Sequence, residues 1–310
     1  MLDPGELLVI GECVADIVRL PGEADVVHPG GSPANVAYGL ARLGHDATLL
    51  TQLGPDAHGR LIRDHLAAAG VGLRTDGSTG PTPTAAVTLD ADGHATYTFA
   101  IGWTLGPVAL ERPPVHVHTG SIASVVEPGA TTVLAGVESL RAGATVSYDP
   151  NVRAELMGEH APAVARVERC VALSDVVKAS DEDLAWLYPG EEAERIAERW
   201  LAAGPALVLV TRGGAGAFAV FDGGRASAEA RPVTVVDTVG AGDAFMSGTL
   251  HALARHGLLG AAGRAGLHAV GRDIVTDVLG RATASAAVTV SRAGANPPDA
   301  VELREARARN

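Results

Sequence analysis

The sequence predicts a doubly wound α/β fold in which a mostly parallel sheet carries helices on both faces. Short apolar runs alternate with helix-like segments from Val115 onward. The strand-like runs are Val115 to Thr119, Thr145 to Tyr148, Val176 to Ala179 and Ala206 to Thr211, and the helix-like runs include Ala161 to Leu173 and Ala193 to Ala203. Strands that are apolar throughout and separated by helices are typical of a parallel sheet buried on both faces.

Two N-terminal stretches alternate apolar and polar residues, the pattern of strands with one exposed face. The first, C-V-A-D-I-V-R at 13–19, lies between a buried strand expected at Leu7 to Ile10 and a helix expected at Asn35 to Leu43. The second, T-A-A-V-T-L-D-A-D-G-H-A-T-Y-T-F at 84–99, contains the hairpin signal D-A-D-G. We expect both stretches to pair into a small sheet that stands off the main body.

Composition and charge exclude several classes of protein. The chain has 310 residues and a formal net charge of -12 without a basic cluster, so it lacks the charge pattern of a nucleic-acid binder. Its start, M-L-D-P-G-E-L-L-V-I-G-E, is unlike a signal peptide, and no uncharged apolar run reaches the roughly 18 residues of a membrane helix. Cys13 and Cys170 have no metal-type spacing and are expected in the core. We expect a cytoplasmic protein without nucleic-acid or membrane partners.

Polar residues follow the predicted parallel strands at the points where the strands end. These segments are T-G-S at 119–121, D-P-N-V-R at 149–153, K-A-S at 178–180 and T-R-G-G at 211–214. The carboxyl ends of parallel strands meet at one edge of a sheet, and ligands bind at that edge in folds of this kind. We therefore expect the four segments to form one polar rim.

The segment G-G-S-P-A-N-V-A at 30–37 has a functional and a structural interpretation. Gly30 and Gly31 permit close backbone approach, and the Asn35 amide can bond sugar hydroxyls. A glycine turn with Ser32 as N-cap and Pro33 at the first helical position would explain the same letters. Alone, the segment does not decide between a sugar site and a helix start.

The segment T-R-G-G-A-G-A at 211–217 is similarly open. It follows a predicted strand, and its backbone amides could contact phosphates. It is neither a Walker A motif nor a Rossmann fingerprint. Because A-F-A-V-F after it resembles another strand, a tight hairpin is the structural alternative.

Three further clusters of polar residues have both a functional and a structural interpretation. In D-P-N-V-R, Asp149 could hold a hydrated magnesium ion and Arg153 could bind phosphate, or the segment could be a type I turn. H-V-H at 116–118 places two imidazoles on one face of a strand without a third ligand, which favours packing over a metal site. The D-E-D run at 181–183 is expected to begin a helix.

The stretch V-D-T-V-G-A-G-D-A-F at 236–245 carries the strongest chemical signal. Gly240, Ala241 and Gly242 precede a helix-like run, so free amides and the helix dipole would converge there on an anion. Asp243 beside them could accept a proton from an attacking hydroxyl. Capping alone also explains an aspartate in the first turn of a helix.

With G-G-S-P-A-N near its start and D-T-V-G-A-G-D-A-F near its end, the chain resembles the ribokinase-like (PfkB) carbohydrate kinases. The resemblance covers nearly the whole chain. It implies one ribokinase-like domain over 1–310, a doubly wound α/β sheet, and a small β lid whose strands are inserted at about 12–28 and 84–104. It also implies an ATP-dependent transfer of a phosphoryl group to a sugar.

The resemblance assigns roles to individual residues. Asp243 would be the catalytic base, and the amides of Gly240, Ala241 and Gly242 would form the anion hole for the transferred phosphoryl. The other expected contacts are Asp16, Gly30, Gly31, Asn35 and Arg153 for the sugar, and Ser180, Thr211, Gly213 and Gly216, together with Gly240 and Gly242, for ATP.

Metal sites follow from the same resemblance. The family's N-x-x-E element, tied to magnesium and phosphate, appears here as S-D-E-D with Ser180 and Asp183 at the matching places, a departure from the family pattern. Magnesium is expected near Asp149 and Asp183. A monovalent cation such as K⁺ binds in many members beside the anion hole, largely through backbone carbonyls, and the matching positions are Asp237, Val239, Thr289, Arg292 and Gly294.

Within the family, G-E-C-V-A-D, Y-D-P-N-V-R, K-A-S-D-E-D and S-R-A-G-A-N-P-P are most similar to the bacterial fructokinase branch. The expected substrate is fructose, phosphorylated on its 6-hydroxyl. The alternatives are a kinase for 2-keto-3-deoxygluconate, ribose, another sugar or a nucleoside, and a non-catalytic sugar or nucleotide sensor. A sugar acid would need a basic residue in the lid, and the lid stretches offer only Arg19 and His94. This scarcity favours a neutral sugar.

Related enzymes often dimerise through their lids. The apolar lid residues Val87, Leu89, Tyr97 and Phe99 could form a homodimer contact or cover the sugar.

Overall fold

A large sheet that is parallel except at one edge forms the centre of the molecule. The computed structural model describes residues 5–20, 22, 24–89, 95–107, 110 and 112–308. Within these residues the sheet has nine strands in the order β13-β12-β11-β10-β9-β8-β1-β4-β5. The strands are β1 Leu7–Ile10, β4 Ala47–Thr51, β5 Gly72–Thr75, β8 His116–Gly120, β9 Thr145–Asp149, β10 Val176–Ser180, β11 Leu207–Thr211, β12 Ala217–Phe221 and β13 Gly224–Ala228.

Seven neighbouring strands of this sheet, β11-β10-β9-β8-β1-β4-β5, run parallel. At the other edge, β12 is antiparallel to β11 and β13 is antiparallel to β12. The segment T-R-G-G-A-G-A at 211–217 joins β11 to β12 as a hairpin, which confirms its structural interpretation. Because β8, β9, β10 and β11 are neighbours in register, their polar carboxyl ends meet at one edge, as predicted.

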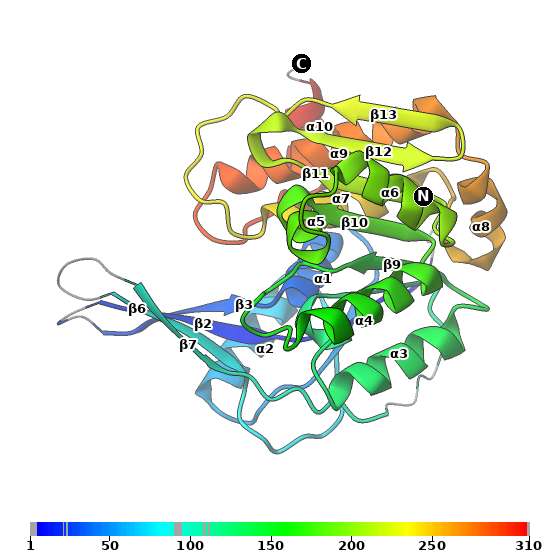
Figure 1. Cartoon of the computed structure of the whole chain (residues 1–310). Coiled ribbons are helices and arrows are strands. Elements are labelled where there is room, and N and C mark those ends of the chain that lie inside the picture. The colour runs from blue at the N-terminus through cyan, green and yellow to red at the C-terminus, as the bar shows by residue number, and fades with distance from the viewer. Residues whose placement is uncertain are drawn as a thin grey trace.

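Helices cover both faces of this sheet (Figure 1). Apolar side chains join one face to α1 Ser32–Arg42, α2 Ala57–Ala68, α7 Ala241–Arg255, α8 Gly260–His268 and α9 Arg272–Val290. The other face packs against α3 Gly129–Leu140, α4 His160–Leu173, α5 Asp181–Leu187 and α6 Ala193–Ala202. The last helix, α10 Ala300–Ala308, packs on α9 through Leu303.

A second, four-stranded sheet extends from the main body in the order β3-β2-β6-β7. Its strands are β2 Val14–Arg19, β3 Val26–Gly30, β6 Thr84–Leu89 and β7 Ala95–Ala100. β2 pairs with β6 in parallel, which confirms that the two alternating stretches join in one small sheet. The D-A-D-G turn expected between β6 and β7 lies outside the described residues. The predicted fold class, a doubly wound sheet with a smaller separate sheet, is confirmed.

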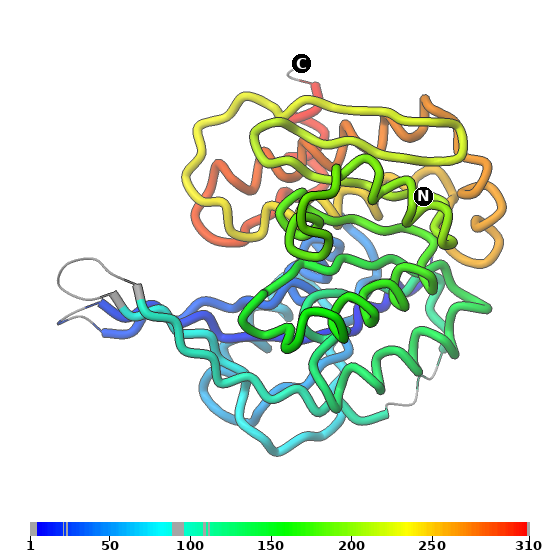
Figure 2. The backbone as a smooth tube through the Cα atoms, viewed as in Figure 1, coloured from blue at the N-terminus to red at the C-terminus, as the bar shows by residue number. Residues whose placement is uncertain are grey.

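The chain path brings distant segments together at the polar edge. In Figure 2 the blue and cyan N-terminal part, which supplies the small sheet, lies below the yellow to red C-terminal part. α1 and α7 nevertheless pack against each other, because Met246 and Leu250 of α7 share a core cluster with Leu40 of α1.

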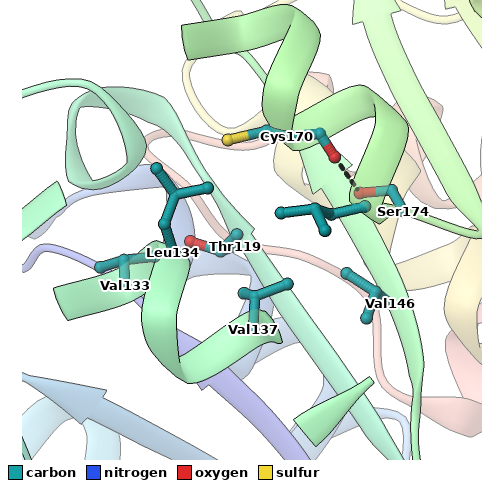
Figure 3. A pocket seen from close by; sticks show the side chains of 8 residues that line it. Thr119, Val133, Leu134, Val137, Val146, Cys170 and Ser174 are labelled. Atoms are coloured by element: carbon teal, nitrogen blue, oxygen red, sulfur yellow. Dashed lines mark hydrogen bonds between the residues drawn. The ribbon is translucent and has the colours of Figure 1, made fainter. Parts of the chain in front are cut away.

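The core where α3 and α4 pack on β8 and β9 is almost completely filled. A cavity of about 10 Å³ remains there, lined by Thr119, Val133, Leu134, Val137, Val146, Cys170, Leu173 and Ser174 (Figure 3). A void of this size holds one water at most and lacks the polar partners that a water needs. Cys13 and Cys170 are both buried, as expected. Among the described residues, no helix combines the length and hydropathy needed to cross a membrane.

Candidate active site

Asp243 lies at the amino end of α7 and is held by side chains from α1. Its carboxylate is 8% exposed. Ser32 Oγ donates to one carboxylate oxygen at 2.6 Å and Asn35 Nδ2 donates to the other at 2.8 Å. Both oxygens therefore have fixed directions at the rim of the sheet.

Ser32 is not the N-cap of α1, which was its role in the structural interpretation of the sequence. α1 begins at Ser32 with Gly31 as its N-cap, so Ser32 is not the cap. Its hydroxyl is directed to Asp243 instead, although 211 positions separate the two residues. No local pattern could reveal this contact, because a serine before a proline is equally good as a cap.

The amino end of α7 is built from backbone that only small residues allow. The N-cap, Gly240, has φ 74° and ψ 3°, and no side chain caps the helix. A Cβ at Gly240 would lie 2.6 Å from Ala295 Cβ, and a Cβ at Gly242 would lie 2.8 Å from Lys178 Nζ. The first-turn amides of a helix have no partner within the helix, so this end can receive an anion.

Asp16, Gly30 and Gly31 meet beside this helix end. β2 and β3 place Asp16 next to Gly30, where any side chain would collide with the Asp16 carboxylate. Gly31 has φ 100°, and a Cβ there would lie 2.6 Å from the Glu12 carbonyl oxygen. Burial raises the pKa of Asp16 to about 6, with Arg153 and then His28 acting in the opposite direction.

Glu12 supports the same corner and was missed by sequence reasoning. Its carboxylate is 2% exposed and accepts the Ala123 amide at 3.2 Å, which ties the end of β1 to the 3-10 turn Ser121–Ser124. Burial raises the pKa of Glu12 to about 7. The only local signal was its place directly after a buried strand.

Asp149 and Lys178 form a buried ion pair below the rim. Lys178 Nζ donates to Asp149 Oδ2 at 2.9 Å, and the two side chains are 4% and 0% exposed. Burial raises the pKa of Asp149 to about 6 although Lys178 opposes the shift. Burial alone would lower the pKa of Lys178, but Asp149 and the other carboxylates raise it overall.

Asp183 joins the start of α5 to the loop after β9. Asp183 and Ser180 form a capping box, in which Ser180 Oγ accepts the Asp183 amide at 2.9 Å and Asp183 Oδ2 accepts the Ser180 amide at 2.8 Å. Asp183 Oδ1 accepts the Val152 amide at 2.7 Å. The D-E-D run thus begins a helix, as predicted.

These contacts bear on how magnesium would be held. Both oxygens of Asp183 and both of Asp149 accept internal hydrogen bonds, the second oxygen of Asp149 from the Asn151 amide at 3.3 Å. No group of three metal-ligating side chains occurs in the described part of the chain. Magnesium keeps several waters and binds readily through substrate phosphates, so the residues present fit a hydrated ion and not a cage of protein ligands.

Arg153 follows β9, and the loop from Thr211 to Gly216 follows β11. The Arg153 guanidinium donates to the Val152 carbonyl at 2.9 Å and lowers the pKa values of Asp16 and Glu12, so its charge lies near these two carboxylates. Thr211 Oγ1 donates to the Ala179 carbonyl at 3.5 Å, so the loop begins beside β10. Gly213 is exposed and has φ 49°, and Gly216 has φ 84°.

The positions expected for a monovalent cation lie in the loop before α7, at the carboxyl end of α9 and in the loop that follows α9. Asp237 Oδ1 accepts the Val239 amide at 3.0 Å and Asp237 Oδ2 accepts the Gly294 amide at 2.8 Å, and these bonds lower the pKa of Asp237. The Arg292 side chain pairs with Glu302 at 2.6 Å, and its amide donates to the Thr289 carbonyl at 3.0 Å. The Asp237 and Arg292 side chains already have partners, so a cation bound here would have to be held by backbone carbonyls.

The two histidines of H-V-H are packing residues, as predicted. His116 bonds Thr145 and Ser147, and His118 bonds Ser147. Burial lowers the pKa of both imidazoles to about 3, so they are neutral near pH 7.

Solved structures with the same architecture define the class. A fructokinase from Xylella fastidiosa with bound ATP superposes with a TM-score of 0.84, is 28% identical, and is matched over 99% of both chains. A double mutant of the fructokinase from Vibrio cholerae O395, with fructose, ADP and a potassium ion bound, gives a TM-score of 0.82 at 27% identity over 98% of both chains. The fold is that of the ribokinase-like sugar kinases.

Sequence comparison identifies the family within this class. Residues 5–301 match the pfkB family carbohydrate kinases, and the chain belongs to this family. The fructokinase of Klebsiella pneumoniae is 39% identical over 268 residues, which cover 82% of this chain and 86% of that protein.

Proposed function

We propose that the protein is an ATP-dependent fructokinase that transfers the γ-phosphoryl group of ATP to the 6-hydroxyl of fructose. The observation that carries the proposal is the Asp243 carboxylate, held by Ser32 and Asn35 beside the uncapped amino end of α7. The bacterial fructokinases among the relatives support fructose as the acceptor.

In the proposed reaction, Asp243 accepts the proton of the sugar hydroxyl while that oxygen attacks the γ-phosphorus and the bond to the β-phosphate oxygen breaks. The products are fructose 6-phosphate and ADP. The amides of Gly240, Ala241 and Gly242 would donate to the equatorial phosphoryl oxygens, where charge is spread during transfer. The hydrogen bonds from Ser32 and Asn35 orient Asp243, so little reorganisation is needed.

The sugar would lie between the small sheet and this helix end. Asp16 can accept hydrogen bonds from its hydroxyls, Gly30 and Gly31 permit its close approach, and Asn35 can contact it from α1. Arg153 is positioned to contact the sugar or the phosphoryl group. Thr211, Gly213 and Gly216, with Ser180 at the end of β10, would line the path of ATP.

Magnesium and potassium complete the proposal. Magnesium would offset phosphate charge as a hydrated ion, near Asp149 and Asp183. Potassium would bind backbone carbonyls in the loop that contains Asp237 and Val239 and around the carboxyl end of α9, at Thr289, Arg292 and Gly294. It would add to the positive potential at the anion hole.

A neutral sugar is also supported by the lid. Arg19 pairs with Asp25 at 3.1 Å and so has a carboxylate partner already. His94 lies outside the described residues. A sugar acid would need a free cation for its carboxylate, and the cations that act on Asp16 are Arg153, which lies outside the lid, and His28 of β3. The 2-keto-3-deoxygluconate arm of the sugar panel tests this alternative.

An ADP-release assay over a sugar panel tests the substrate. The panel contains fructose, glucose, ribose, 2-keto-3-deoxygluconate and a nucleoside, each at several concentrations with ATP and magnesium. We expect the highest kcat/KM for fructose. A higher value for another sugar would refute the fructose assignment, and no turnover of any of them would refute the kinase proposal.

We further propose a cytoplasmic homodimer that associates through the small sheet. Val26, Tyr97 and Phe99 of this sheet are 44%, 66% and 36% exposed, and Tyr97 stacks near Phe99 with ring centroids 6.5 Å apart. Light scattering should give twice the chain mass, and Tyr97→Ser should lower it. A monomer mass for the unaltered protein would refute the association.

A further inference from the structure

Lys178 extends from the central sheet to the amino end of α7. It lies on β10, and its side chain is 4% exposed. Its Nζ donates to Asp149 at 2.9 Å and would lie only 2.8 Å from a Cβ at Gly242. The ammonium group is therefore directly beside the turn whose amides would receive the transferred phosphoryl.

Several carboxylates share this one ammonium group. Asp149, Asp183 and Asp243 all act electrostatically on Lys178. The imidazole of His118, on which Lys178 also acts, is neutral near pH 7, because burial lowers its pKa to about 3. The positive charge of this buried network therefore belongs to Lys178.

A purely structural role explains this arrangement poorly. A buried ion pair contributes little stability relative to apolar residues of the same volume, because both charges lose their hydration. A lysine ammonium has three protons, and the bond to Asp149 uses one of them. Phosphoryl transfer, in contrast, brings several negative charges to a helix end that already adjoins three carboxylates, and a fixed cation beside it opposes their repulsion.

We propose that Lys178 is a positioning residue for phosphoryl transfer, which fixes the first turn of α7 and supplies positive charge beside the anion hole. This inference rests on the proposed kinase function. Lys178 acts through the turn at Gly242 and transfers no proton. Asp243, in contrast, is the proposed proton acceptor. Its effect is specific to the state in which negative charge occupies the helix end.

The test compares two variants that differ only at Lys178. Lys178→Met alone leaves Asp149 buried without its partner, so the variant can fail to fold. Asp149→Asn combined with Lys178→Met removes both charges and keeps the volumes, and the matched control is Asp149→Asn alone. Lys178→Gln in the otherwise unaltered chain keeps a donor for Asp149 and removes the charge, and provides a second comparison.

We expect kcat of the double variant to be about 100-fold below that of Asp149→Asn, the size of effect seen when an oxyanion donor is removed. The KM for the sugar should stay the same, because Lys178 does not contact it. Lys178→Gln should lose a similar factor relative to the unaltered enzyme. Equal kcat values in both comparisons would overturn the proposal and leave Lys178 as a structural partner of Asp149.

Binding of a phosphoryl mimic provides a readout without turnover. ADP with aluminium fluoride presents a planar anion at the transfer position, whereas ADP alone does not. The double variant should bind ADP as Asp149→Asn does and bind the fluoride complex more weakly, by about the factor lost in kcat. Unchanged binding of the complex would overturn the inference. If the unaltered protein turns over no sugar, the proposed function fails; if it is active and the variants match their controls, only the inference about Lys178 fails.

Discussion

Replacing Asp243 with asparagine separates catalysis from helix capping. The change is isosteric, and the hydrogen bonds can be kept: the amide oxygen can accept from Asn35 Nδ2, and the Ser32 hydroxyl can turn to accept from the new amide group. The fold should therefore survive. What is lost is the carboxylate that we propose to accept the proton of the sugar hydroxyl.

The expected loss follows from that role. General-base catalysis contributes about 10²- to 10⁴-fold, which corresponds to about 3–5 kcal/mol of transition-state stabilisation. We expect kcat of Asp243→Asn to fall by this factor in the ADP-release assay at saturating sugar and ATP. The KM for the sugar should change little, because the lost interaction belongs to the transition state.

A matched control lies at the start of α9. Asp273 is also in the first turn of its helix, but it is exposed. Asp273→Asn removes the same charge from the same kind of position, so it should cost only the few tenths of a kcal/mol of a surface dipole interaction and leave kcat unchanged. If Asp243→Asn kept kcat within about threefold of the unaltered enzyme, capping would suffice and the base assignment would be wrong.

Three other outcomes are expected. Ser32→Ala should lower kcat roughly tenfold in the same assay, because a hydrogen bond to a charged group contributes about 1.5–3 kcal/mol; an unchanged kcat would contradict its orienting role. Because burial raises the pKa of Asp16 to about 6, its carboxylate is lost as the pH falls through 6, and the KM for the sugar should rise there in a pH series; Asp16→Asn should abolish that rise. Gly240→Ala should destabilise the fold by about 1–3 kcal/mol in thermal unfolding, because φ is 74° and Ala295 lies in the way; an unchanged melting temperature would show that the turn can adjust.

Several buried strands were predictable because they are short apolar runs separated by helix-like segments, although the equally buried β4 was not among the predicted strands. Thr145 to Tyr148 and Val176 to Ala179 were each predicted to within one residue of the observed β9 and β10. β13, Gly224–Ala228, was not predicted, because an exposed edge strand of small and polar residues has no apolar run to reveal it. Helix starts were less accurate, since the capping glycine at Gly31 allows α1 to begin at Ser32 and not at Asn35.

The candidate site was predictable only in part, for a related reason. The glycines and Asp243 stand together in the sequence, and their spacing indicates an anion site. Lys178 stands in V-V-K-A-S, which is an ordinary strand end when read alone. Its proximity to Gly242 depends on how α7 packs across β10, and local sequence carries no information about that packing.

The fold resolves why an aspartate in the first turn of α7 is more than a cap. A capping carboxylate bonds the amides of its own helix and so consumes the donors that an anion would need. Asp243 instead has both oxygens bonded by side chains of α1, while Gly240 at the N-cap offers no side chain. The Ala241 amide donates to the Thr238 carbonyl at 3.3 Å, whereas the amides of Gly240 and Gly242 have no backbone acceptor among the described residues and can bind a ligand, with the Asp243 carboxylate held beside them. Because Ser32 and Asn35 bond both Asp243 oxygens, Asp243 does not cap α7. The proposed proton acceptor and the proposed anion site can therefore lie side by side.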